Sequence, residues 1–192
     1  MLFTSHSNNS NRIMAIFSET ELKEFAELQK RYGAPGASLL PVLWHIQEKR
    51  GWIDEAAMEE AAAICQVPKA HVRGVVEFYT MFFDKPMGKY HVQVCTNVSC
   101  MLRGGEKLLA EMKSKIGVEN LATTPDGMFS IEEVECMGAC GGAPMMAVNE
   151  TFFETITNEE AHGVIDHIRA KNEIPTPRFV AQMPELSEAA NR

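Results

Sequence analysis

Four of the five cysteines in this 192-residue chain fall into two closely spaced pairs. Cys95 and Cys100 bound the segment CTNVSC, and Cys136 and Cys140 bound CMGAC. Each pair lies just past a stretch with strand-like alternation, so two strands of one sheet would present four thiolates at one edge. A [2Fe–2S] cluster takes four cysteine thiolates, two for each iron. The spacing therefore predicts one cluster, with Cys95 and Cys100 on one iron and Cys136 and Cys140 on the other.

Three other uses of these cysteines compete with this interpretation. Structural zinc also binds four cysteines, but its usual C-x2-C spacing is absent from both pairs. Redox-active dithiols normally have the C-x-x-C spacing, which is absent as well. Burial as apolar side chains explains any single cysteine, but not four beside glycine-rich loops that end strands. The glycines of the second loop would let backbone amides hydrogen-bond cluster sulfurs, namely Gly138, Gly141 and Gly142.

The remaining cysteine and the histidines predict no further metal ligands. Cys65 ends an alanine-rich segment, so we expect it in a helical core. His45 and His71 fall in predicted helices and His91 on a predicted strand, and none recurs at ligand spacing with a cysteine.

Nor does the sequence predict a nucleotide site or a catalytic residue. No glycine-rich loop leads from a strand into a helix, so the chain carries no NADH or flavin fingerprint. Met145 and Met146 flank the second cysteine loop, where we expect them to fill core space rather than bind iron. The sequence thus favours an electron carrier that is not catalytic alone.

Composition excludes several classes of partner. The chain has 18 basic and 26 acidic residues, a net charge of −8, which disfavours nucleic acid and anionic membranes. No run approaches the ~20 apolar residues of a membrane span. The first 17 residues lack a secretory pattern and contain only Arg12 as a basic residue, so we expect a disordered leader or a start at Met14. An odd cysteine count argues against a disulfide framework and fits an intracellular protein.

The first part of the chain predicts a small helical bundle. Ser18 and Glu21 form a capping-box pattern ahead of an apolar stripe that ends near Tyr32. Asp54 can cap a third helix, and Pro68 can open a fourth that runs through the segment HVRGVVEFYTMFF. The second helix is expected over residues 38–50, with a buried side made of Leu39, Leu40, Leu43 and Ile46. The first helix should bury Leu22, Phe25, Ala26 and Leu28.

The second part predicts a small α/β domain in the order β-α-β-β-β-α. Strands are expected at residues 90–94, 128–135, 145–149 and 151–156, with helices over 103–116 and 158–171. Asn158 is the expected cap of the last helix. The fold class is therefore α+β: a disordered leader (1–17), a helical domain (18–84), the cysteine-bearing domain (85–171) and an extended tail (172–192).

With these residues in view, the chain resembles the thioredoxin-like [2Fe–2S] subunit of respiratory complex I, the 24-kDa or E-type subunit of NADH:quinone oxidoreductase. Four stretches carry the resemblance: LLPVLWHIQEKRGWI, GVVEFYTMFFDKPMGKYHVQVCTNVSCMLRGG, TTPDGMFSIEEVECMGACGGAP and NETFFETIT. The chain departs from the commonest pattern at Gly141–Gly142, where bulkier residues are usual, and at Phe152–Phe153, where paired tyrosines are usual.

The resemblance implies a thioredoxin-like ferredoxin domain behind a helical N-terminal domain, with one [2Fe–2S] cluster on Cys95, Cys100, Cys136 and Cys140. It implies docking to the subunit that binds NADH and FMN, beside other peripheral-arm subunits. The location would be cytoplasmic, on the inner face of the membrane, or the matrix in a mitochondrion. The same module occurs in NAD-linked hydrogenases and formate dehydrogenases, and these alternatives stay open, as does a zinc-stabilised interaction module.

Overall fold

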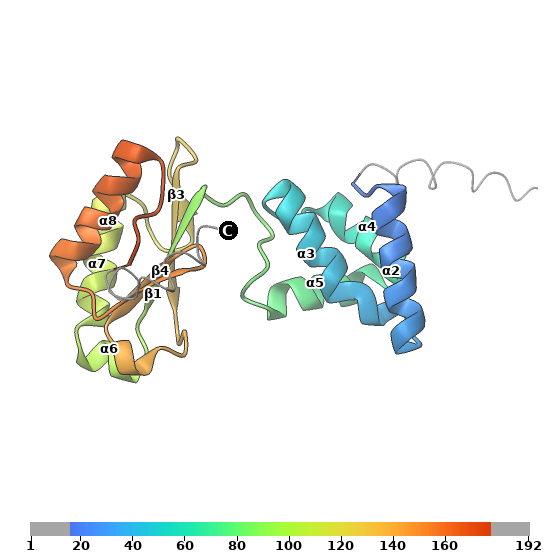
Figure 1. Cartoon of the computed structure of the whole chain (residues 1–192), viewed down its shortest axis with the longest axis horizontal. Helices are drawn as coiled ribbons and strands as arrows, with labels where there is room; N and C mark the ends of the chain where they lie inside the picture. The colour runs from blue at the N-terminus through green and yellow to red at the C-terminus, as the bar shows by residue number, and fades with distance from the viewer. Residues whose placement is uncertain (1–15, 178–192) are drawn as a thin grey trace, which may run out of the picture. The chain divides into compact units, whose positions relative to one another are not determined.

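The structure, a computed structural model, describes residues 16–177 and divides the chain into two compact units, Met1–Pro86 and Met87–Arg192 (Figure 1). Each unit has a hydrophobic core of its own. The division falls in the turn-rich segment DKPMGK, where the sequence predicts the boundary between residues 84 and 85. Residues 1–15 of the predicted leader, Met14 among them, and residues 178–192 of the predicted tail lie outside the described residues.

The described part of the first unit consists of short helices: α2 (Glu19–Tyr32), η1 (Pro35–Ser38), α3 (Leu39–Arg50), α4 (Glu55–Cys65) and α5 (Lys69–Phe78). The predicted capping box at α2 is confirmed. Glu21 donates its backbone N–H to Ser18 Oγ (3.3 Å), and its carboxylate accepts the backbone N–H of Ser18 (2.8 Å). Asp54 caps α4 as predicted, accepting the N–H of Ala57 at 2.7 Å.

Three details of the predicted bundle are wrong. The helix α5 ends at Phe78 rather than running to Phe83, because Tyr79 takes an extended conformation with φ −89° and ψ 112°. Leu40 is 41% exposed, whereas Val42 is fully buried beside Leu39 and Leu43. Ala26 is exposed as well, so a single residue of α2, Phe25, is fully buried.

The predicted leader begins to pack against the bundle before α2 starts. Phe17 is 3% exposed and meets Phe25 edge to face at 5.2 Å between ring centroids. Lys49 Nζ donates to the carbonyl oxygen of Ile16 at 3.0 Å. The assignment of Ile16 and Phe17 to a disordered leader is therefore wrong, because an apolar residue just before a helix can bury itself against that helix.

The described part of the second unit alternates strands and helices: β1 (Tyr90–Cys95), α6 (Val98–Leu102), α7 (Gly105–Ile116), β2 (Ala122–Thr123), β3 (Phe129–Val134), η2 (Cys140–Gly142), β4 (Met145–Val148), β5 (Thr151–Glu154) and α8 (Asn158–Lys171). The sheet has the order β2-β3-β1-β4-β5. Strands β1 and β3 pair in parallel, and the other neighbours pair antiparallel. The predicted α+β class is confirmed.

The core of this unit lies between the sheet and two helices. Figure 1 shows α7 and α8 side by side against one face of the sheet. Alternate strand residues reach this core, as the period of two requires: Tyr90, Val92 and Val94 from β1, Phe129 and Ile131 from β3, Met146 and Val148 from β4, and Phe153 from β5.

The sequence analysis missed helix α6, strand β2 and the cap of helix α8. Helix α6 and strand β2 are too short, at five and two residues, to show a hydrophobic period. The cap of α8 is Thr157, not Asn158, because Thr157 and Glu160 form a reciprocal capping box. After α8, residues 172–177 form no helix or strand, and Ile174 packs against the core.

Candidate metal centre

The parallel pairing of β1 with β3 brings the two cysteine loops to one edge of the sheet. In this register Cys95, the last residue of β1, lies opposite Val134, the last residue of β3. The backbone N–H of Thr96 donates to the Val134 carbonyl at 3.1 Å, so the two chains leave the sheet together. Cys136 follows two residues later. The expected meeting of both strand ends therefore occurs.

The first loop turns at once into α6, which carries Cys100. Asn97 caps this helix by accepting the N–H of Val98 on its side-chain oxygen at 2.6 Å. The chain then passes into α7 at Gly105, whose backbone lies against the loop. A Cβ atom at Gly105 would lie 2.6 Å from the Cys95 carbonyl oxygen and 2.9 Å from that of Cys100. Glycine at this position thus permits the fold of the first loop.

The second loop holds its two sulfurs at metal-ligand spacing. The Sγ atoms of Cys136 and Cys140 lie 3.9 Å apart. Two thiolates on one tetrahedral metal ion, each at ~2.3 Å, lie ~3.8 Å apart. Gly138, at φ +78°, donates its backbone N–H to Cys136 Sγ at 3.4 Å, which confirms an amide-to-sulfur bond in this loop.

Glu154, the last residue of β5, and Thr155, directly after it, contact the end of the second loop. The N–H of Thr155 donates to the Gly142 carbonyl at 2.5 Å. The side chain of Glu154 covers Gly142 so closely that a Cβ there would clash with it. The chain departs from the commonest family pattern at Gly141 and Gly142. Of these two glycines, Gly142 leaves room for the carboxylate side chain of Glu154.

The thiols are close enough to influence one another. Burial raises the pKa of the Cys100 thiol to about 11, and the neighbouring Cys95 thiol adds to the rise, while the Met145 N–H opposes it by hydrogen-bonding the Cys100 sulfur. Cys136 raises the pKa of Cys140, and a hydrogen bond from Ser99 opposes that rise. Four thiolates so placed need a positive charge to compensate them, and bound iron would supply it.

The two pairs differ in their exposure to solvent. Cys95 and Cys100 are 3% and 2% exposed and pack with Ala143 and Met145, whereas Cys136 and Cys140 are exposed. In residues 16–177, no three His, Cys, Asp or Glu side chains gather as ligands of a single ion. Four thiols on two loops at one sheet edge, with the sulfurs of Cys136 and Cys140 at 3.9 Å, are a donor set that fits a cluster that takes two thiolates at each of two irons.

The fifth cysteine, the histidines and the methionines considered in the sequence analysis lie in helices, strands or the hydrophobic core. Cys65 is fully buried and lies 3.4 Å from Ser38 Oγ. His45 and His71 lie on α3 and α5. His91 is buried on β1, with its ring nitrogens 2.9 Å from Ser130 Oγ and 2.9 Å from a Glu132 carboxylate oxygen. Met145 and Met146 are buried core residues, 1% and 0% exposed, as expected.

Sequence reasoning missed one residue of the site. Gly105 makes the close approach to the first loop. The sequence signal for Gly105 is the pair Gly104–Gly105 after CTNVSCMLR. The first glycine can end a helix, and a second glycine beside it indicates a close approach of the backbone.

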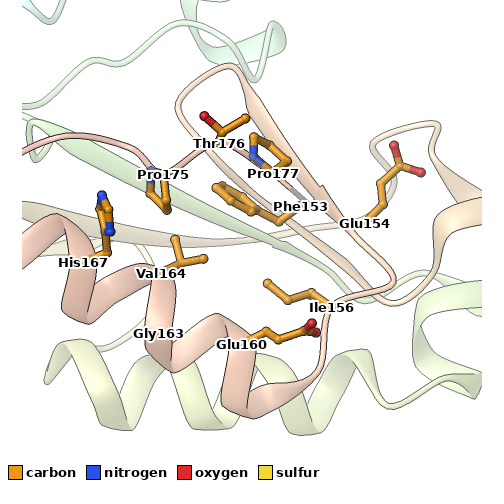
Figure 2. A pocket seen from close by; sticks show the side chains of 10 residues that line it. All are labelled: Phe153, Glu154, Ile156, Glu160, Gly163, Val164, His167, Pro175, Thr176 and Pro177. Atoms are coloured by element: carbon orange, nitrogen blue, oxygen red, sulfur yellow. The ribbon is translucent and has the colours of Figure 1, made fainter. Parts of the chain in front are cut away.

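A separate cavity of about 250 Å³ lies between α8, β5 and the segment after α8 (Figure 2). Its walls are largely apolar, with Phe153, Ile156 and Val164 facing Pro175 and Pro177. None of the four paired cysteines lines it. The cavity therefore contributes nothing to the metal centre.

Comparison with known proteins gives a family match. Residues 25–169 match the family described as thioredoxin-like [2Fe–2S] ferredoxin. The E-type subunit of the NADH-quinone oxidoreductase of Rickettsia bellii is 36% identical over 156 residues, which cover 80% of this chain and 93% of that protein. NADH dehydrogenase (ubiquinone) flavoprotein 2, mitochondrial, of Dictyostelium discoideum is 40% identical over 155 residues, covering 80% of this chain and 61% of that protein.

A solved structure gives a likeness of fold. The NAD+-reducing [NiFe]-hydrogenase in its H2-reduced state superposes with a TM-score of 0.60 at 21% identity, over 74% of this chain. The aligned part makes up 23% of that hydrogenase chain, so this chain spans under a quarter of its length.

Proposed function

This chain belongs to the thioredoxin-like [2Fe–2S] ferredoxin family, and from that premise we propose that it holds one [2Fe–2S] cluster on Cys95, Cys100, Cys136 and Cys140. The observation that carries the assignment is the meeting of two cysteine loops at the ends of the parallel strands β1 and β3. The Cys136–Cys140 sulfur separation of 3.9 Å supports ligation of one iron by that pair.

The chain is an electron-transfer subunit of NADH:quinone oxidoreductase, the NADH dehydrogenase of complex I. The match with this chain extends over most of the length of relatives that bear that name. The family to which the chain belongs is described as a [2Fe–2S] ferredoxin, which supports the cluster. A [2Fe–2S] cluster accepts and releases one electron at a time. The protein would hold the thiolates, bury Cys95 and Cys100 away from water, and direct the backbone N–H of Gly138 at the Cys136 sulfur.

The partner in this proposal is the subunit that binds NADH and FMN. The described chain offers no phosphate-binding loop between a strand and a helix, so the cofactors that react with NADH would belong to that subunit. Other peripheral-arm subunits would be further partners, and neither nucleic acid nor a membrane insertion is needed. The bundle of the first unit, which holds no cluster ligand, would dock this chain in its complex.

Localisation follows from the complex in this proposal. In the part of the chain that the structure describes, no helix has the length and apolar character needed to cross a membrane. We place the chain on the inner face of the membrane as a peripheral part of its complex, in the cytoplasm or the mitochondrial matrix.

A second candidate function is the same electron-transfer role in an NAD-linked hydrogenase or formate dehydrogenase. The likeness of fold to the NAD+-reducing [NiFe]-hydrogenase favours it as the alternative. Isolation of the complex under native conditions would separate the two: co-purification with quinone-reducing subunits supports the first function, and co-purification with a nickel-containing subunit supports the second.

The cluster itself is tested by composition. Purified protein should be reddish-brown and contain two irons and two acid-labile sulfides per chain. A colourless protein that carries one zinc per chain would instead support the zinc-stabilised module and remove the proposed function.

A further inference from the structure

The side chain of Glu154 lies against the backbone at the end of the second cysteine loop. A Cβ atom at Gly142 would be 2.7 Å from the Glu154 Cδ atom and closer still to its Oε2 atom. The N–H of Thr155, directly after Glu154, donates to the Gly142 carbonyl oxygen at 2.5 Å. The carboxylate therefore occupies the space that any larger side chain at Gly142 would fill.

The pairing of β4 with β5 directs Glu154 to the side of the sheet where the proposed ligands lie. Glu154 is the partner of Met145 in this pairing, and directly opposite residues of neighbouring strands point to the same face. Met145 belongs to the small apolar cluster that contains Cys95 and Cys100. The strand register and the contact with Gly142 thus place the same carboxylate beside the candidate metal centre.

The charge of this carboxylate has no counterion in the structure. Among residues 16–177, no lysine, arginine or histidine lies within ion-pair distance of Glu154. Glu154 is exposed, and an exposed glutamate side chain carries a negative charge at neutral pH. It therefore adds uncompensated negative charge to the end of the loop.

The length of chain between Gly142 and Cys140 keeps this charge near a proposed ligand. Two Cα–Cα steps of ~3.8 Å separate the two residues, so the Glu154 carboxylate lies within roughly 10 Å of Cys140. Reduction adds one electron, and so one negative charge, to a [2Fe–2S] cluster, and a nearby negative charge opposes that addition. At ~10 Å in water, one unit charge changes the equilibrium constant for reduction about twofold.

We propose that the Glu154 carboxylate lowers the reduction potential of the cluster by adding a negative charge beside the second cysteine loop. This inference rests on the proposed function, because it requires the cluster at the four cysteines. Gly142 permits the effect, since a larger side chain there would displace the carboxylate from the loop. Glu154 acts through the electric field of its charge, so its effect depends on that charge and on salt, and it is not a ligand.

The experiment compares variants of the full-length protein in redox titrations, with dithionite as the electron donor and electron paramagnetic resonance to measure the reduced cluster. Glu154→Gln removes the charge at nearly constant shape, Glu154→Lys reverses it, and Glu154→Asp retains it. Glu150→Gln removes the same charge at an exposed position in the turn between β4 and β5. That turn is the opposite end of the hairpin, ~10 Å farther along the strand from the loop.

At low ionic strength, Glu154→Gln should raise the midpoint potential by about 18 mV, which is a twofold change at ~59 mV per tenfold for one electron. Glu154→Lys should raise the potential further, whereas Glu154→Asp and Glu150→Gln should keep the wild-type value. In ~1 M salt, where the Debye length is about 3 Å, these differences should shrink. Iron and sulfide analysis establishes that each variant carries an intact cluster, and if Glu154→Lys loses its cluster, Glu154→Gln against Glu154→Asp still isolates the charge.

Equal or more negative potentials in Glu154→Gln and Glu154→Lys at low salt would overturn the inference. A shift that Glu154→Asp also shows, or that persists at high salt, would overturn it as well, because such a shift would come from packing rather than from charge. Absence of iron and sulfide from the wild-type protein would instead overturn the proposed function.

Discussion

Gly105 lies against the carbonyl oxygen of Cys95, so closely that a Cβ atom at Gly105 would be 2.6 Å from that oxygen. The same atom would be 2.9 Å from the carbonyl oxygen of Cys100. Both neighbours are backbone atoms of one loop, and neither can move without moving a proposed ligand. The start of α7 therefore sets the shape of the first cysteine loop.

Replacing Gly105 by Ala should reduce cluster content without unfolding the first unit, because the added methyl group displaces the loop that carries Cys95 and Cys100. We expect a loss of at least about 2 kcal/mol in the free energy of unfolding of the second unit, as for other overpacked sites. Iron and sulfide analysis with thermal unfolding measures both effects.

The matched control for this change is Gly163→Ala on α8, where an added Cβ meets nothing within 4 Å. Alanine is the better helix former, so this variant should gain up to ~1 kcal/mol and keep its cluster. A full cluster and unchanged stability in Gly105→Ala would show that the loop adapts to the methyl group.

Substitution of the proposed ligands tests their assignment directly. Cys→Ala at position 95, 100, 136 or 140 leaves an iron short of one thiolate, so each variant should lose its cluster or hold it weakly. Cys65→Ala should keep the full cluster, because Cys65 lies in the separate core of the first unit. Iron, sulfide and visible absorption would be measured on all five proteins. A full cluster in Cys136→Ala, or loss confined to Cys65→Ala, would refute the ligand set.

The purified chain alone should not oxidise NADH. The proposed function assigns both NADH and FMN to the partner subunit, so turnover with an artificial electron acceptor should appear only after that subunit is added. The measurement is NADH absorbance over time, with free flavin removed beforehand. NADH oxidation by the lone chain would contradict the division of cofactors between the two subunits.

Acid should weaken the start of α2 through Glu21. A hydrogen bond from Lys49, 2.6 Å away, and bonds from Ser18 lower the pKa of Glu21 to about 2 from its usual 4.5. Since the folded-state pKa is the lower one, the stabilisation is complete above about pH 4.5 and is lost as the pH falls towards 2. In Glu21→Gln, this part of the pH dependence of unfolding should disappear, and Glu24→Gln, an exposed neighbour on the same helix, should retain it.

Parts of the fold follow from the sequence where a local signal is strong. The caps at Ser18 and Asp54 and the strand that ends at Cys95 agree with their predictions because side-chain caps and a period of two are local properties. Phe17 is buried and Leu40 is exposed, contrary to their predictions. Their burial depends on which helix packs against them, and spacing along the chain does not contain that information.

The candidate site divides in the same way. Spacing predicts the four cysteines, because ligands must recur at the ends of neighbouring strands. It does not predict Gly105, whose close approach to the carbonyl oxygens of Cys95 and Cys100 depends on how the chain folds between them. Gly142 is similar: its need for a small side chain comes from Glu154 on the adjoining strand β5, a contact formed only after the sheet has paired.

The two units should divide docking from electron transfer. The cysteines of both pairs lie beyond Pro86, in a unit with a hydrophobic core of its own, so a protein that begins at Lys85 should keep its cluster. Its potential should stay near the wild-type value, because potential depends chiefly on sulfur hydrogen bonds, charge and exposure at the cluster. The first unit holds no proposed ligand and exposes apolar side chains, among them Trp44 at 39% and Phe78 at 77%.

Removing that unit should therefore weaken binding to the NADH- and FMN-binding subunit by at least ~10-fold, about 1.4 kcal/mol. Full-length and truncated proteins would be compared by titration against the isolated partner, with potentiometry on the same samples to establish that both carry intact clusters. Cys65→Ala in the full-length chain controls for mild destabilisation of the bundle. Equal affinity in the two proteins would show that the cluster-bearing unit docks unaided, and loss of the cluster on truncation would show that the second unit depends on the first.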